Sequence, residues 1–116
     1  MKLVLTLLGG LMLAASIQAT AEFTTVDRAY EVPFEHLRMP ESVNGQLAFK
    51  QCDDCELMQV DTVPGTRYLI NDEALDLADF RLLMFRARSE ALRAGNVVTV
   101  LHNLETDTIV SVSVYL

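Results

Sequence analysis

The sequence predicts an α+β domain in which one α-helix packs against a strongly twisted antiparallel sheet of about five to six strands. Three observations lead to this fold class. One long segment carries the apolar spacing and the end signals of an amphipathic helix, strand-like segments stand on both sides of it, and turn-forming residues join these segments in pairs. A sheet of this kind can also curl into a partial barrel, and the sequence leaves both forms open.

The first residues, 1–21, predict a secretory signal peptide. Lys2 is followed by an apolar run and then by small residues that end in the stretch Ala-Thr-Ala. This is the charged, apolar and small-residue order of a signal peptide, and the two alanines fit a cleavage site between Ala21 and Glu22. Cleavage after Ala19 is the alternative.

The remaining residues, 22–116, are predicted to form one small domain. The apolar run of the signal is shorter than the roughly 20 residues that a membrane-spanning helix needs, and no later segment is long and apolar enough to span a bilayer. We therefore expect a periplasmic or secreted protein with no membrane span after the signal is removed. An uncleaved membrane anchor is the alternative.

The charge balance excludes partners that require a basic surface. The chain has 9 lysines and arginines against 16 aspartates and glutamates, a net charge of −7, and loss of Lys2 with the signal makes this −8. Nucleic acids and anionic membrane surfaces attract proteins with excess positive charge. We expect no nucleic-acid partner, and we interpret the acidic residues, most of which lie in residues 22–79, as solvated surface.

Residues 22–44 give the weakest structural signal. The stretch YEVPFEHL begins like a strand, but Pro33 limits it to the edge of a sheet. Pro40 and the pair Asn44-Gly45 then indicate a loop.

The next segment, QLAFKQ to ELMQV, predicts a β-hairpin around the two cysteines, with Asp53 and Asp54 as a two-residue loop. The antiparallel register then sets three pairs of residues opposite one another: Leu47 and Val60, Phe49 and Met58, Cys52 and Cys55. An Asp-Asp loop is not a favoured tight turn, so a covalent bond between the cysteines would help to hold it.

A second hairpin with Asn71-Asp72 at its turn leads into the helix. Asp76 is a suitable N-cap, the helix covers residues 77–94, and Gly95 is a natural residue to end it. An apolar stripe at spacings of three and four is predicted to face the sheet, formed by Phe80, Leu83, Met84, Ala87 and Ala91 and widened by Phe85 and Leu92.

The C-terminal segment predicts a third hairpin, from NVVTVLHN and TIVSVSVYL. In its second strand, valines alternate with polar or aromatic residues: Val110, Val112 and Val114 against Ser111, Ser113 and Tyr115. This period of two predicts one buried face and one face in water.

Cys52 and Cys55 are the only cysteines, and we interpret them as a structural disulfide. An exported protein meets oxidising conditions that favour pairing. Redox catalysis is the alternative, because a C-x-x-C pair exchanges disulfides when one thiol has a lowered pKa. Asp53, Asp54 and Glu56 disfavour the thiolate that such an exchange requires.

Metal binding is the second alternative for the cysteines. A zinc site could use Cys52 and Cys55 with His36 and His102, although their spacing matches no common zinc module. The stretch C-x-x-C-x-x-M, which adds Met58, would suit Cu(I). Our interpretation is a structural disulfide with neither metal nor cofactor.

No motif in the sequence places a nucleophile beside a base, so the sequence favours a small exported domain that binds rather than catalyses. Its partner would be an envelope or extracellular protein, bound at a sheet edge or in a groove between helix and sheet. A thiol–disulfide redox protein or a copper- or zinc-binding protein that uses Cys52 and Cys55 is the alternative.

Overall fold

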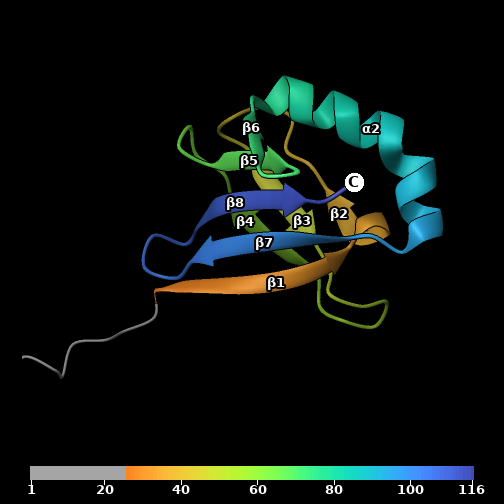
Figure 1. Cartoon of the computed structure of the whole chain (residues 1–116). Helices are drawn as coiled ribbons and strands as arrows, with labels where there is room; N and C mark the ends of the chain where they lie inside the picture. Colours follow the sequence, from red (N-terminus) through yellow and green to blue (C-terminus); the bar gives the residue numbers. More distant parts are fainter. Residues whose placement is uncertain (1–25) are drawn as a thin grey trace, which may run out of the picture.

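A computed structural model describes residues 26–116, so the predicted signal peptide and the cleavage site between Ala21 and Glu22 lie outside the described residues. One helix, α2 (Leu77–Ala94), packs against an eight-stranded sheet, which confirms the α+β class (Figure 1). The strands are β1 (Asp27–Pro33), β2 (Leu37–Arg38), β3 (Gln46–Phe49), β4 (Met58–Asp61), β5 (Arg67–Ile70), β6 (Glu73–Leu75), β7 (Val97–Asn103) and β8 (Thr108–Val114), with a short 3₁₀ helix η2 (Phe34–His36) after β1. Eight strands exceed the predicted number because the segment before residue 45 contributes two strands, β1 and β2.

The sheet is mixed rather than antiparallel throughout. Its main order is β1-β7-β8-β4-β3-β2, and β5 also pairs with β8 and carries β6 on its other side. Strand β8 runs antiparallel to β7 but parallel to β4 and β5. Parallel neighbours need a long crossover connection, and α2 followed by β7 supplies it between β5 and β8. As predicted, β1 is an edge strand, since it pairs only with β7.

The sheet is open but curled. Tyr30 on β1 and Phe49 on β3 pack against each other with ring centroids 5.3 Å apart, although β7, β8 and β4 separate their strands in the sheet order. The curl encloses one core, to which α2 contributes Leu77, Phe80, Met84 and Ala91. The Phe80 ring lies 5.4 Å from that of Tyr68 on β5, which fixes the start of the helix on the sheet.

Two of the three residue pairs predicted for the first hairpin lie opposite each other in the sheet. Leu47 lies opposite Val60 and Phe49 opposite Met58, as the apolar pattern requires. At the second hairpin, Asn71 and Asp72 have φ of 51° and 67°. Positive φ at both central residues is the requirement of a type I′ turn, and Asn and Asp tolerate this conformation better than most residues.

Two buried threonines hold the loop that carries the chain from β4 to β5 along β8. The Thr66 hydroxyl donates a hydrogen bond to the Ile109 carbonyl oxygen at 2.6 Å, and the Thr62 hydroxyl accepts one from the Gly45 amide at 3.1 Å. These bonds join segments that are far apart in the sequence, and they satisfy polar groups that would be costly to bury unpaired.

The alternation predicted for the last strand shifts within β8. Ile109 pairs with His102 and Ser111 with Leu101, which leaves Val110 as an extra residue at a β-bulge. The buried side chains are therefore Ile109, Val112 and Val114, while Val110 is only half-buried.

The ends of α2 are as predicted. The Asp79 amide donates to the Asp76 side chain at 2.8 Å, and Gly95 has φ of 68°, the left-handed conformation that ends many helices. The apolar stripe is narrower than predicted, because Leu83, Phe85 and Leu92 are exposed. No helix of the described residues is long and apolar enough to cross a membrane.

Candidate functional site

The two cysteines form a disulfide in an exposed loop. Cys52 and Cys55 are bonded, their Cα atoms are 5.0 Å apart, and the Cys55 amide donates to the Cys52 carbonyl oxygen at 3.2 Å. The predicted pairing is confirmed, but its setting differs from the prediction. Strand β3 ends at Phe49 and strand β4 begins only at Met58. The disulfide therefore closes a turn inside the loop between them and does not join the ends of the two strands.

His36 lies beside this loop because β2 extends along β3. The Lys50 amide donates to the His36 carbonyl oxygen at 3.1 Å, and Leu37 pairs with Phe49. These backbone contacts place His36, the last residue of η2, next to Lys50, the first residue of the disulfide loop (residues 50–57). The imidazole is largely covered, with 16% of the side chain exposed.

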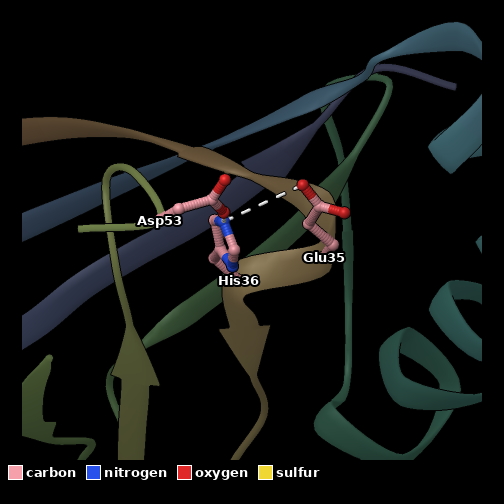
Figure 2. Close-up of side chains that lie close together, drawn as sticks. All are labelled: Glu35, His36 and Asp53. Carbon is pink, nitrogen blue, oxygen red and sulfur yellow. Dashed lines mark hydrogen bonds and ion pairs between the residues drawn. The ribbon is translucent and has the colours of Figure 1, made fainter. Parts of the chain in front are cut away.

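Two carboxylates approach the His36 ring. Its Nε2 lies 2.6 Å from Oδ1 of Asp53 and 3.8 Å from Oε1 of Glu35. Figure 2 shows both carboxylates turned toward the ring, one from the disulfide loop and one from η2. The Asp53 and Glu35 side chains are 86% and 58% exposed, so the ring is the fixed part of this cluster and the carboxylates reach water.

Asp53 is held from three directions. It stands inside the disulfide-closed turn, its carboxylate contacts His36, and its carbonyl oxygen accepts a hydrogen bond from Nζ of Lys50 at 3.2 Å. A side chain on an exposed loop would otherwise sample many positions. The covalent closure and these contacts together restrict where the carboxylate lies.

The structure does not assemble the metal ligands that the sequence suggested as an alternative. Both sulfurs are used in the disulfide, and Met58 packs against the core opposite Phe49. His102 is buried on β7 and contacts Asp107 through Nε2 at 2.7 Å. In the described part of the chain, the one group of three His, Cys, Asp or Glu donors with ligand atoms within 4.8 Å of one another is Glu35, His36 and Asp53.

Sequence reasoning named His36 but missed Glu35 and Asp53 as its neighbours. Glu35 is adjacent in the sequence, yet a Glu-His pair alone has no diagnostic spacing. Asp53 comes close only because β2 pairs with β3, and the two-residue strand β2 carries no pattern that predicts this pairing.

An open groove of about 1140 Å³ is lined by α2, by the side of β3 and β4 that points away from the core, and by the segment of η2, β2 and the loop that follows, residues 34–45. Ala48, Leu57 and Gln59 lie on its sheet side. Arg81, Met84, Phe85 and Arg88 lie on its helix side, and Glu35 and His36 also line it. The groove and the histidine cluster are therefore continuous.

Phe85 is the most unusual side chain of the groove. It is 77% exposed, although a phenylalanine in the middle of a helix would normally be buried. Arg81 and Arg88 stand four residues before and three residues after it, so the three side chains share one side of the helix. Among the described residues, no carboxylate lies within 4.0 Å of either guanidinium, and Arg81 makes only one long hydrogen bond, at 3.4 Å to the Glu41 carbonyl oxygen.

Comparisons with known proteins found no matching family model, no similar curated protein and no similar solved structure.

Proposed function

We propose that this protein is an exported, non-catalytic binding domain that holds a segment of another protein in the groove between α2 and the sheet. The observation that carries the proposal is Phe85, which stands 77% exposed between Arg81 and Arg88 on the groove side of the helix. Aromatic residues, including phenylalanine, and arginine are enriched at protein interfaces, and arginine is among the residues that often carry most of the binding energy.

The charges of the groove indicate the chemistry of its partner. Its lining has four basic and three acidic residues: Arg38, Lys50, Arg81 and Arg88 against Glu35, Glu41 and Asp61. This balance of +1 contrasts with a net charge of −7 for the whole chain. A partner segment with carboxylates would approach the arginines, and an apolar side chain of that segment would cover Phe85 and Leu57.

The side-chain contacts support binding rather than catalysis. His36 and His102, the two histidines of the chain, hydrogen-bond to Asp53 and Asp107, and neither has a hydrogen bond to a hydroxyl or thiol within the described residues. Nucleophilic catalysis by serine, threonine or cysteine usually requires such a contact with a base. The sulfurs of Cys52 and Cys55 are already bonded to each other.

The disulfide also supports a location outside the cytoplasm. Disulfides of this structural kind persist in the periplasm and outside the cell and are rare in the cytosol. A periplasmic or secreted location would also agree with the predicted signal at residues 1–21. The partner would then be an envelope or extracellular protein.

A peptide library displayed on phage provides the test. We expect the selected peptides to carry several carboxylates beside a bulky apolar residue. Phe85→Ala should weaken binding of a selected peptide by about tenfold or more, the effect of truncating a central interface anchor. Arg88→Ala should weaken it several-fold, with a smaller loss at high salt because charges in water are screened.

The same helix offers matched controls outside the groove. Leu82→Ala removes another exposed apolar side chain, and Arg86→Ala removes another exposed arginine. Both variants should bind the peptide like the wild type. Equal affinity of the wild type, Phe85→Ala and Arg88→Ala would show that the groove is not the binding site.

A further inference from the structure

We propose that Glu35, His36 and Asp53 form a binding site for a divalent transition-metal ion, with Zn²⁺ as the best-suited ion. This site is distinct from the peptide-binding role of the groove, because the proposed ion contacts only the end of the groove beside the disulfide loop. It also differs from the cysteine sites that the sequence suggested, since it uses no sulfur.

The donor atoms match the chemistry of such ions. The cluster offers one imidazole nitrogen and two carboxylate oxygens, and Zn²⁺ binds both types at about 2.0–2.2 Å. Mixed nitrogen and oxygen donors also suit Mn²⁺, Ni²⁺ and Cu²⁺. The central donor is the imidazole, which separates this group from the clusters of carboxylates that are common on acidic protein surfaces.

The distances are close to those of a coordinated ion. With bonds of about 2.1 Å, tetrahedral geometry sets donor atoms about 3.4 Å apart. Nε2 of His36 lies 2.6 Å from Asp53 and 3.8 Å from Glu35, and all three donor atoms lie within 4.8 Å of one another. To reach that spacing, the Asp53 oxygen would have to move about 0.8 Å away from Nε2 and the Glu35 oxygen about 0.4 Å closer to it. The proton of the hydrogen bond between His36 and Asp53 would be released as the ion binds.

The surroundings allow the two carboxylates to move but hold the His36 ring in place. Both carboxylates are exposed and can change rotamer, whereas the His36 ring is mostly covered and its backbone is tied to Lys50 by a hydrogen bond. The disulfide limits how far Asp53 can move away from the ring. A site whose ligands are already close together loses less conformational entropy when the ion binds.

Two charge effects act on the ion in opposite directions. The net charge of −7 attracts cations to the protein as a whole. The Lys50 ammonium, which donates to the Asp53 carbonyl oxygen, repels them locally. Because both carboxylates reach water, the remaining coordination positions would be open to solvent or to a carboxylate of a bound partner.

The test uses the full mature protein with its disulfide intact and with no affinity tag. Titration with Zn²⁺ alone, by calorimetry and by competition with a chromophoric chelator, should give one ion per chain. His36→Ala and Asp53→Asn should each weaken the affinity by more than about tenfold, and Glu35→Gln should weaken it less because Glu35 is the more distant donor. Co²⁺ bound to the same protein should show the visible absorption of a nitrogen- and oxygen-coordinated ion, and His36→Ala should abolish it.

Asp54→Asn is the matched control. Asp54 stands beside Asp53 in the same disulfide-closed turn, so its replacement removes the same charge from the same loop but no proposed ligand. Its affinity should stay within about twofold of the wild type. If Asp53→Asn and Asp54→Asn weakened Zn²⁺ binding equally, the loss would come from the surface charge alone, and the proposed site would be wrong. The absence of saturable binding, or binding lost in His102→Ala but kept in His36→Ala, would also overturn it.

Discussion

Nε2 of His36 lies 2.6 Å from Oδ1 of Asp53, and this contact joins the end of η2 to a turn that a disulfide closes. The two residues are 17 positions apart in the sequence. The disulfide closes the turn that contains Asp53, the residue that contacts the histidine. Asp53 therefore belongs both to the turn that the disulfide stabilises and to the proposed ion site.

Replacing both cysteines with serine should lower the free energy of unfolding by about 2 kcal/mol. The bond closes a four-residue turn, and the chain-entropy model gives this value for so small a loop. The fold should remain, because the core contains neither cysteine. Urea denaturation of the two proteins measures the difference, and a change below about 0.5 kcal/mol would contradict a stabilising role.

The same disulfide should be a weak oxidant. Asp53, Asp54 and Glu56 surround it with negative charge, which disfavours the thiolate that would stabilise the reduced form. Equilibration with glutathione buffers followed by alkylation measures its reduction potential. A potential as high as that of dedicated oxidants would favour redox work by Cys52 and Cys55 instead.

Two phenylalanines of α2 should differ sharply in their contribution to stability. Phe80 is fully buried against Tyr68, and Phe80→Ala should cost about 3–5 kcal/mol through lost burial and the remaining cavity. Phe85 is 77% exposed, and Phe85→Ala should cost less than about 0.5 kcal/mol. Urea melts of the two variants provide a comparison between identical substitutions on one helix. Equal losses would mean that the burial of the helix has been assigned to the wrong face.

Features set by neighbouring residues were predictable from the sequence. The Asp76 cap, the Gly95 stop and the Asn71-Asp72 turn each depend on a side chain acting on backbone a few residues away. The first hairpin register followed from an apolar pattern with a period of two, because a shift by one residue would expose Leu47 and Phe49.

Features set by distant contacts were not predictable. The sequence predicted the β7–β8 hairpin, but nothing in it reveals that β4 and β5 pair with β8 in parallel. The bulge at Val110 also leaves Ile109 buried in place of Val110. Helical spacing also placed Phe85 in the apolar stripe, but the sheet covers only the narrower row that contains Phe80 and Met84. The approach of Asp53 to His36 depends on the β2–β3 pairing, which the sequence does not reveal.

The mature protein should begin at Glu22. The small residues Ala19 and Ala21 fit the cleavage site of a signal peptide. Mass spectrometry of exported protein should give the mass of residues 22–116 less two hydrogens for the disulfide. Membrane-bound protein that retains Met1 would contradict the prediction and favour an uncleaved anchor.

Alkaline pH should destabilise the fold through Tyr68. Burial raises the pKa of this phenol above its ordinary value of 10.0. The unfolded chain then loses the proton near pH 10, while the folded chain keeps it to higher pH. Because the folded state binds more protons in this range, stability is complete below about pH 10 and falls as the pH rises through the folded pKa.

Tyr115 is a second tyrosine with a raised pKa, so its ionisation must be distinguished from that of Tyr68. The Tyr115 hydroxyl donates a hydrogen bond to the Asp72 carboxylate at the β5–β6 turn, and this bond raises the pKa of Tyr115 as well. Absorbance of tyrosinate should therefore show two late transitions, of which Tyr115→Phe removes one and Tyr68→Phe the other. Urea unfolding midpoints of the wild type and the two variants, measured at about pH 9 and about pH 11, show how much each tyrosine contributes to the loss of stability. The midpoint should fall less between these pH values in Tyr68→Phe than in the wild type, and an equal fall in both proteins would rule out Tyr68 as the group responsible.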